Sequence, residues 1–180
     1  MNTKTVKKIL LIEDNPGDIR LMKELLKEIT SFEHELLVAE NLKDGCELIK
    51  ENNIILILLD LNLPDSSGKQ TFDNIIGLAQ SIPVVLVSGM NDSELSLELI
   101  KKGAQDFILK QDLNNSLLGK TIHFAILRKQ LEEALKASAA ELLIANKELV
   151  FQNDEKEKRA AELLIANKEL AFQSEEKEKR

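Results

Sequence analysis

Acidic, hydroxyl and ammonium side chains stand at the ends of short apolar runs in this sequence. They are Glu13, Asp14, Asp60, Ser88 and Lys110. If the runs are parallel strands, their carboxyl ends share one edge of a sheet, and the five side chains meet in one shallow pocket. Clustered carboxylates repel one another unless positive charge lies among them. A hard cation such as Mg²⁺ (or Mn²⁺) takes oxygen ligands there, and Lys110 adds a compact positive charge.

The chemistry that suits these residue types is phosphoryl transfer rather than hydrolysis by a pair of carboxylates. Asp60 can attack an activated phosphorus and form an aspartyl phosphate. The cation and Lys110 would offset charge on the phosphoryl oxygens during an in-line displacement. The Ser88 hydroxyl can donate a hydrogen bond to the new phosphoryl group. We therefore predict that Asp60 is a phosphate acceptor.

Strand and helix patterns alternate through the first two-thirds of the chain and would position these residues. Alternation of this kind predicts a parallel sheet with helices on both faces. The run at residues 54–59 is apolar at every position, as expected of a central strand covered on both sides. The predicted strands are residues 9–12, 36–39, 54–59, 83–87 and 106–109. The predicted helices are residues 18–29, 42–52, 69–80 and 93–101, and one that begins near residue 113.

Four segments carry a resemblance to a known family. They read ILLIEDN at 9–15, LLDLNLPDSSG at 58–68, PVVLVSG at 83–89 and GAQDFILK at 103–110. In order and spacing they resemble the receiver domains of two-component response regulators, over residues 6–128. The resemblance implies a flavodoxin-like five-stranded parallel sheet in the order 2-1-3-4-5, with helices on both faces and the last helix extended into a tail.

The resemblance also implies a role for each residue of the pocket. Asp60 would be the phosphoacceptor, and Glu13 and Asp14 the acidic pair. The metal would be held by Asp14, Asp60 and the backbone carbonyl of Asn62, with Glu13 acting largely through water.

On the other side of the pocket, the resemblance makes Ser88 and Lys110 the remaining phosphate contacts. Phe107 would be the aromatic switch that packs inward on activation, although plain packing in the core explains a Phe at this position equally well. One departure from the family pattern is Gln111, where a proline often follows the lysine.

Composition excludes several classes of function. The net charge of −7 argues against broad nucleic-acid binding, which needs a basic face. Cys46 is the only cysteine, so we expect neither an intrachain disulfide nor a thiolate metal cluster. The longest apolar run, residues 54–59, is too short to cross a bilayer, and we expect a cytoplasmic protein without a membrane partner. Because neither common Gly-rich nucleotide loop is present, we expect no ATP binding and no enzyme activity of the chain's own.

The last third of the sequence contains a tandem repeat. Residues 139–159 and 160–180 differ only at the position pairs 150/171, 153/174 and 154/175, so the period is 21 residues, or three heptads. We divide the chain into a receiver domain at 1–128 and a helical coiled-coil extension at 129–180. With no Gly or Pro after Gly119, a helix from Lys120 to Arg180 would be roughly 90 Å long.

One seam of this helix has a heptad pattern that suits a parallel homodimer. The seam is interrupted by polar and charged residues, and the alternative is a charged single helix that frays in isolation. Each repeat carries five acids and four bases, unlike a basic helix that binds membranes. The apolar and small members of the seam are Leu135, Leu142, Ala145, Leu149, Leu163, Ala166 and Leu170, and its polar members include Ser138, Gln152, Lys156, Arg159, Gln173 and Lys177.

These observations predict a phosphorylation-dependent switch in a two-component phosphorelay. A partner histidine kinase would donate the phosphoryl group to Asp60, and the C-terminal helix would transmit the change. One alternative is the N-terminal fragment of a hybrid histidine kinase or nucleotide cyclase whose output domain lies further on. Another is an oligomeric scaffold that is never phosphorylated, although a scaffold gains nothing from clustered carboxylates.

Overall fold

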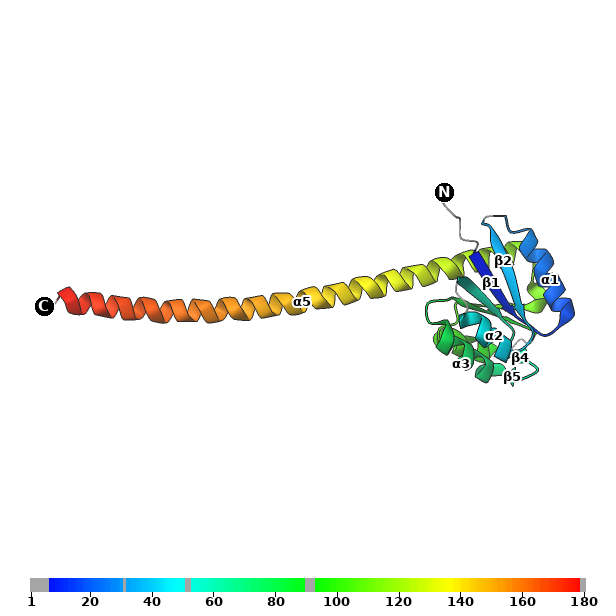
Figure 1. The fold of residues 1–180 in the computed structure, drawn as a ribbon, viewed down its shortest axis with the longest axis horizontal. Helices are drawn as coiled ribbons and strands as arrows, with labels where there is room; N and C mark the ends of the chain where they lie inside the picture. Colours follow the sequence, from blue (N-terminus) through cyan, green and yellow to red (C-terminus); the bar gives the residue numbers. More distant parts are fainter. Residues whose placement is uncertain (1–6, 31, 51–52, 90–92, 179–180) are drawn as a thin grey trace. The chain divides into compact units, whose positions relative to one another are not determined.

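The computed structural model describes residues 7–30, 32–50, 53–89 and 93–178 and contains a five-stranded parallel sheet (Figure 1). The sheet order is β2-β1-β3-β6-β7. This is the predicted order 2-1-3-4-5, because a separate short hairpin takes the labels β4 and β5. The flavodoxin-like fold is therefore confirmed. The five strands are β1 (Lys7–Ile12), β2 (His34–Ala39), β3 (Ile54–Leu59), β6 (Val84–Ser88) and β7 (Asp106–Leu109).

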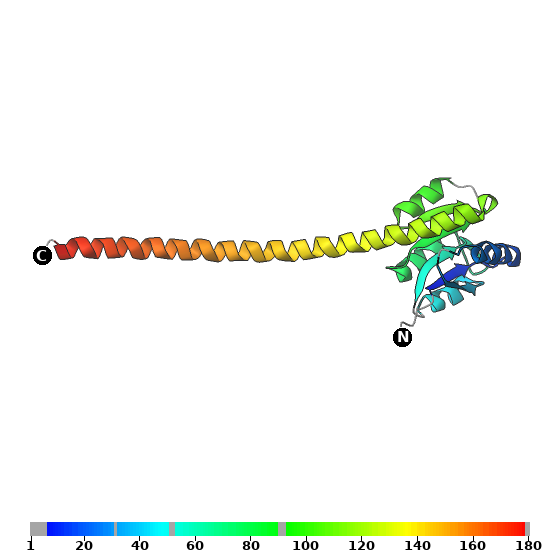
Figure 2. The same cartoon turned by 90° about the horizontal axis from the view of Figure 1, so that it is seen from above.

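Helices cover both faces of the sheet (Figures 1 and 2). β3 packs toward both helical layers, since Leu56 and Leu58 face one core, and Ile57 and Leu59 face the other. All four side chains are fully buried, as the wholly apolar run predicted. One layer holds α1 (Pro16–Lys27) and the first turns of α5 (Asn115–Glu178), and the other holds α2 (Leu42–Lys50), α3 (Gly68–Ala79) and α4 (Ser93–Lys101).

Helix α1 begins two residues before its predicted start, because Asn15 caps it. The Asn15 side chain accepts hydrogen bonds from the backbone N–H groups of Gly17 and Asp18, and Pro16 occupies the first helical position. Both features are typical of helix N-termini. The end of α2 is Lys50, and the predicted residues 51 and 52 lie outside the described part of the chain.

A two-stranded hairpin follows β3 that the sequence patterns did not predict. Its strands are β4 (Asn62–Leu63) and β5 (Ser66–Ser67). The Asp65 carboxylate at its turn accepts hydrogen bonds from the backbone N–H groups of Leu42 (2.8 Å) and Lys43 (3.0 Å). Asp65 therefore caps α2 from a distant part of the sequence, and these bonds hold the pKa of its carboxyl below the ordinary value.

Helix α5 follows a short 3-10 turn, η1 (Lys110–Asp112), and the chain divides into two compact units, Met1–Glu133 and Ala134–Arg180. The division falls just beyond Glu132, whose carboxylate accepts hydrogen bonds from the side chain of Gln105, the residue before β7. Its place differs by a few residues from the division drawn at residue 128. None of the described helices is long and apolar enough to span a membrane.

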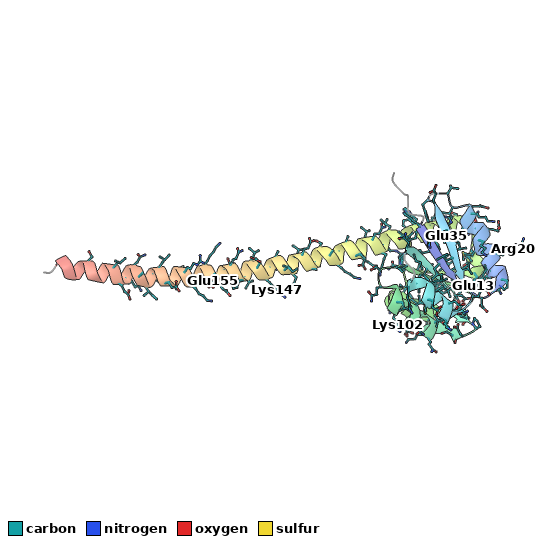
Figure 3. All side chains as sticks on the ribbon, in the orientation of Figure 1. Glu13, Arg20, Glu35, Lys102, Lys147 and Glu155 are labelled. Atoms are coloured by element: carbon teal, nitrogen blue, oxygen red, sulfur yellow. The ribbon has the colours of Figure 1, made fainter. Side chains whose placement is uncertain are left out.

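The second unit is the tail part of α5, whose side chains are shown in Figure 3 around Lys147 and Glu155. The predicted long helix is present here. Its large apolar side chains stand on all sides: Leu142, Leu143 and Ile144 are consecutive, and all three are more than half exposed. The coiled coil itself stays a prediction, because it requires a second chain.

Candidate functional site

The predicted pocket residues stand at the carboxyl edge of the sheet. Glu13 directly follows β1 (labelled in Figure 3), Asp60 directly follows β3, and Ser88 is the last residue of β6. Lys110 directly follows β7. Because all these strands are parallel, their side chains reach the same edge from four neighbouring elements.

Lys110 is the central charge of the site. Its Nζ lies 2.6 Å from Asp60 Oδ2, 2.7 Å from Glu13 Oε2 and 2.7 Å from Asp18 Oδ2. Burial by itself would lower the pKa of Lys110, but the hydrogen bonds to Asp18, Asp60 and Glu13 outweigh it and raise the pKa above its ordinary value. Lys110 therefore carries a full positive charge at neutral pH.

The two buried carboxylates, Glu13 and Asp60, are each held from two sides. Asp60 Oδ1 accepts a hydrogen bond from the Asn62 backbone N–H (3.1 Å). Glu13 Oε1 accepts one from the Asn15 backbone N–H (3.1 Å). Burial raises the pKa of Glu13, and the contact with Lys110 opposes that shift. Backbone donors thus orient both side chains, with one oxygen of each directed to Lys110.

A divalent cation fits the acidic part of this site. Glu13, Asp14 and Asp60 each offer a carboxylate oxygen, and these oxygens all lie within 4.8 Å of one another. Glu13 and Asp60 are buried while Asp14 is exposed, so the group opens to solvent on one side. Mg²⁺ prefers such hard oxygen donors, keeps part of its water shell, and needs only a few protein ligands. The predicted carbonyl ligand, Asn62, is next to this group, two residues after Asp60.

Ser88 is the last residue of β6, and Phe107 lies in the neighbouring strand β7. Ser88 is buried, while Phe107 is half-buried and packs against the core on the α3 side of the sheet. Together with Asn62, Gly68 and residues of α4, they line a small cavity. The Phe107 side chain therefore packs against the core and also borders a cavity. This position is compatible both with the aromatic switch and with plain core packing.

Asp18 belongs to this site although sequence patterns did not single it out. It lies in the first turn of α1, away from any strand end, so the search for polar residues after apolar runs passes over it. Asp18 could have been identified from its position, because it lies one helical turn after Glu13-Asp14 and in the first turn after the helix cap at Asn15. Gln111 leaves Lys110 in reach of the pocket, and no cis peptide bond occurs in the described part of the chain.

The sheet order and this acidic edge define a receiver-type α/β domain. In agreement, the family described as the response regulator receiver domain matches residues 9–122. The chain belongs to this family.

Individual relatives point the same way. The chain is 34% identical over 143 residues to the nitrate/nitrite response regulator protein NarL of Escherichia coli, covering 77% of this chain and 64% of NarL. It is 24% identical over 128 residues to the two-component response regulator ARR11 of Arabidopsis thaliana, covering 70% of this chain and 23% of that protein. The chain thus spans less than two thirds of these relatives.

Solved structures of response regulators superpose on about two thirds of the chain. A response regulator receiver domain protein from Clostridium thermocellum has a TM-score of 0.62 at 26% identity, covering 70% of this chain and 98% of its own. A two-component response regulator from Clostridium difficile has a TM-score of 0.59 at 25% identity, covering 69% of this chain and 98% of its own.

Proposed function

We propose that this chain is a phosphorylation-dependent switch that accepts a phosphoryl group on Asp60 from the phosphohistidine of a partner histidine kinase. The observation that carries the proposal is the buried Asp60 carboxylate, with Lys110 on one oxygen and a cluster of carboxylates suited to a cation beside it. The chain itself would be a phosphate acceptor and not an enzyme.

The transfer places each pocket residue in a distinct role. An Asp60 carboxylate oxygen forms a bond to phosphorus while the bond from phosphorus to the donor's imidazole nitrogen breaks, and the imidazole keeps that electron pair. Lys110 offsets the negative charge on the phosphoryl oxygens, and Ser88 donates a hydrogen bond to the product. Asn62 keeps Asp60 oriented through its backbone N–H.

A cation held by Glu13, Asp14 and Asp60, with the Asn62 carbonyl, would supply positive charge that offsets the phosphoryl oxygens. Glu13 would act largely through water. Mg²⁺ is the expected ion, and Mn²⁺ has the same oxygen preference. These residues otherwise leave the pocket with an excess of negative charge, which would repel an incoming phosphate.

The signal would leave the pocket through β7 and α5. The first residue of β7 and the residue before it contact α5: Asp106 pairs with Arg128 at 3.1 Å, and the Gln105 side chain donates to Glu132 at 3.3 Å. Lys110 follows the other end of the same strand. A change in what Lys110 and Phe107 contact would therefore act on the strand that anchors the helix close to Glu133.

Self-association of the tail completes the proposal. Leu142, Leu149, Leu163 and Leu170 are all more than half exposed in the single chain, and all lie on the predicted seam. A parallel homodimer would bury them, and its interrupted seam leaves a pairing that modest energies can alter. We place the protein in the cytoplasm and expect no nucleic-acid or membrane partner.

Intact mass after incubation with Mg²⁺ and acetyl phosphate tests the proposal. One phosphoryl adduct is expected on the parent chain and none on Asp60→Asn, and excess EDTA in the reaction should prevent the adduct. Asp73→Asn is the matched control, because Asp73 is an exposed carboxylate on α3 that pairs with Lys102. This variant should be phosphorylated like the parent. A folded parent chain that gains no mass would end the claim for Asp60.

A further inference from the structure

We propose that Asp18 is a positioning residue, which keeps Lys110 in the pocket when Glu13 and Asp60 turn to the cation and the phosphoryl group. The inference rests on the proposed phosphoryl transfer to Asp60. It concerns a residue outside the acidic cluster and outside every strand end.

The contacts of Lys110 are saturated in the structure. An ammonium group has three N–H donors. Three carboxylates lie within 2.7 Å of its Nζ, those of Glu13, Asp18 and Asp60. For Lys110 to bind a phosphoryl oxygen, at least one of these acceptors must therefore be given up.

Two of the three acceptors have a second task and Asp18 does not. Glu13 and Asp60 belong to the group of oxygens suited to a cation, and Asp60 also forms the bond to phosphorus. Asp18 is absent from that group among the described residues. Once the cation and the phosphoryl group are bound, the carboxylates of Glu13 and Asp60 interact with them and attract Lys110 less strongly. The Asp18 carboxylate remains available to Lys110.

Asp18 is also built to stay in place. Its backbone N–H donates to the Asn15 side chain at 3.3 Å, within the cap that fixes the first turn of α1. Its side chain is about one-third exposed (34%), whereas that of Lys110 is 18% exposed. Because lysine ends in a point charge on a flexible four-carbon stem, an ammonium without such an anchor samples many positions. Asp18 would hold one N–H of Lys110 while another turns to the phosphoryl group.

Two readouts test this role, using the full chain. The first is the rate of phosphorylation by acetyl phosphate with saturating Mg²⁺. Asp18→Asn should lower the maximal rate about fivefold, the size of one partly exposed ion pair, with little change in half-saturation by the donor. Asp18→Glu should recover most of the rate. Glu24→Gln, which removes an exposed charge paired with Lys27 on the same helix, should behave like the parent.

The second readout needs no phosphorylation. With Mg²⁺ present, acetic anhydride should acetylate Lys110 several-fold faster in Asp18→Asn than in the parent. The extent of acetylation is measured by mass spectrometry of the peptide that contains Lys110. The two proteins are compared at equal acetylation of their other lysines. A parent-like maximal rate, or unchanged labelling of Lys110 in a folded variant, would overturn the role of Asp18. Failure of the parent chain to gain a phosphoryl group would instead refute the proposed function, and the labelling would still decide whether Asp18 anchors Lys110.

Discussion

The Nζ atom of Lys110 lies 2.6 Å from Oδ2 of Asp60, across the end of an intervening strand. Asp60 follows β3 and Lys110 follows β7, while β6 lies between these strands in the sheet. The lysine side chain therefore bridges the carboxyl edge and closes the acidic pocket from one side. The pocket still holds more carboxylates than this ammonium can neutralise, because Glu13 and Asp18 share it with Asp60 and the Asp14 carboxylate lies beside Glu13 and Asp60.

Replacing Asp60 by Asn should stabilise the chain when no divalent cation is bound. The change removes one of several mutually repelling carboxylates and keeps the shape of the side chain. We expect the free energy of unfolding to rise by roughly 1 kcal/mol in EDTA, as is common where a functional site holds unfavourable charge. Urea unfolding of parent and variant measures the difference.

With Mg²⁺ bound, the parent should instead have the larger free energy of unfolding of the two proteins. The parent gains about 2.7 kcal/mol at one hundred times its dissociation constant, while the variant, with one ligand fewer, gains less at the same concentration. If Asp60→Asn is already the less stable protein in EDTA, the contact with Lys110 outweighs the repulsion and this account of the pocket is wrong.

Replacing Asp65 by Ala should weaken the start of α2. The variant loses both hydrogen bonds to Leu42 and Lys43 and the negative charge at the helix N-terminus. Loss of such a cap costs about 1 kcal/mol. The folded pKa of Asp65 is below its ordinary value, so its contribution is complete above the unfolded pKa and is lost as the pH falls through the folded pKa.

Urea unfolding at several pH values measures this effect. The gap between the parent chain and Asp65→Ala should be full at neutral pH and should narrow in strong acid, where the protonated carboxyl keeps an acceptor oxygen but no charge. Asp65→Asn, which retains one acceptor oxygen but no charge, should fall between them. A gap that is independent of pH would show that the carboxylate charge does not stabilise α2.

Replacing Gly45 by Ala should disturb the packing of Ile12, the buried residue before Glu13. A Cβ at this position in α2 would lie 2.6 Å from Cδ1 of Ile12, a fully buried residue that directly precedes Glu13. Overpacking of this kind costs about 1–3 kcal/mol, which exceeds the gain of up to about 1 kcal/mol from replacing Gly in a helix. We expect a net loss of stability and weaker Mg²⁺ binding, measured by urea unfolding and by titration.

Gly77 provides the matched control for that change. It lies in α3, and a Cβ there meets nothing within 4 Å. Gly77→Ala should therefore stabilise the chain by roughly 0.5–1 kcal/mol and leave Mg²⁺ binding unchanged. If both substitutions stabilise the chain, Ile12 can shift to make room for the added methyl group, and overpacking at Gly45 does not disturb the Mg²⁺ site.

Local patterns predicted the parallel sheet and the residues at its strand ends, because a parallel sheet sends every carboxyl end to one edge. Glu13, Asp60, Ser88 and Lys110 could be located this way. Asp18 and Asp65 could not, since each acts through a contact with a residue far along the chain and neither follows an apolar run. The two contacts arise from how α1 and the β4–β5 hairpin are placed against the sheet, which depends on packing and not on periodicity.

The tail sequence predicted a helix because helical periodicity and the absence of Gly and Pro are local properties. Its pairing depends on a second chain. We expect Leu142→Glu with Leu163→Glu to abolish self-association, because both residues lie on the seam and charges there would face one another in a parallel dimer. Sedimentation velocity of the full chain should show a dimer for the parent and a monomer for this variant.

The neighbouring leucines provide the control. Leu143→Glu with Leu164→Glu adds the same charge one residue away, off the seam, to side chains that are also more than half exposed in the single chain. This variant should remain a dimer, and thermal unfolding of the receiver part should match the parent in both variants, because the tail forms a separate compact unit. Equal loss of self-association in the two variants would assign the interface to the whole apolar circumference and not to one seam. A monomeric parent chain would leave α5 as a single helix, and the signal would then have to pass through contacts of the receiver alone.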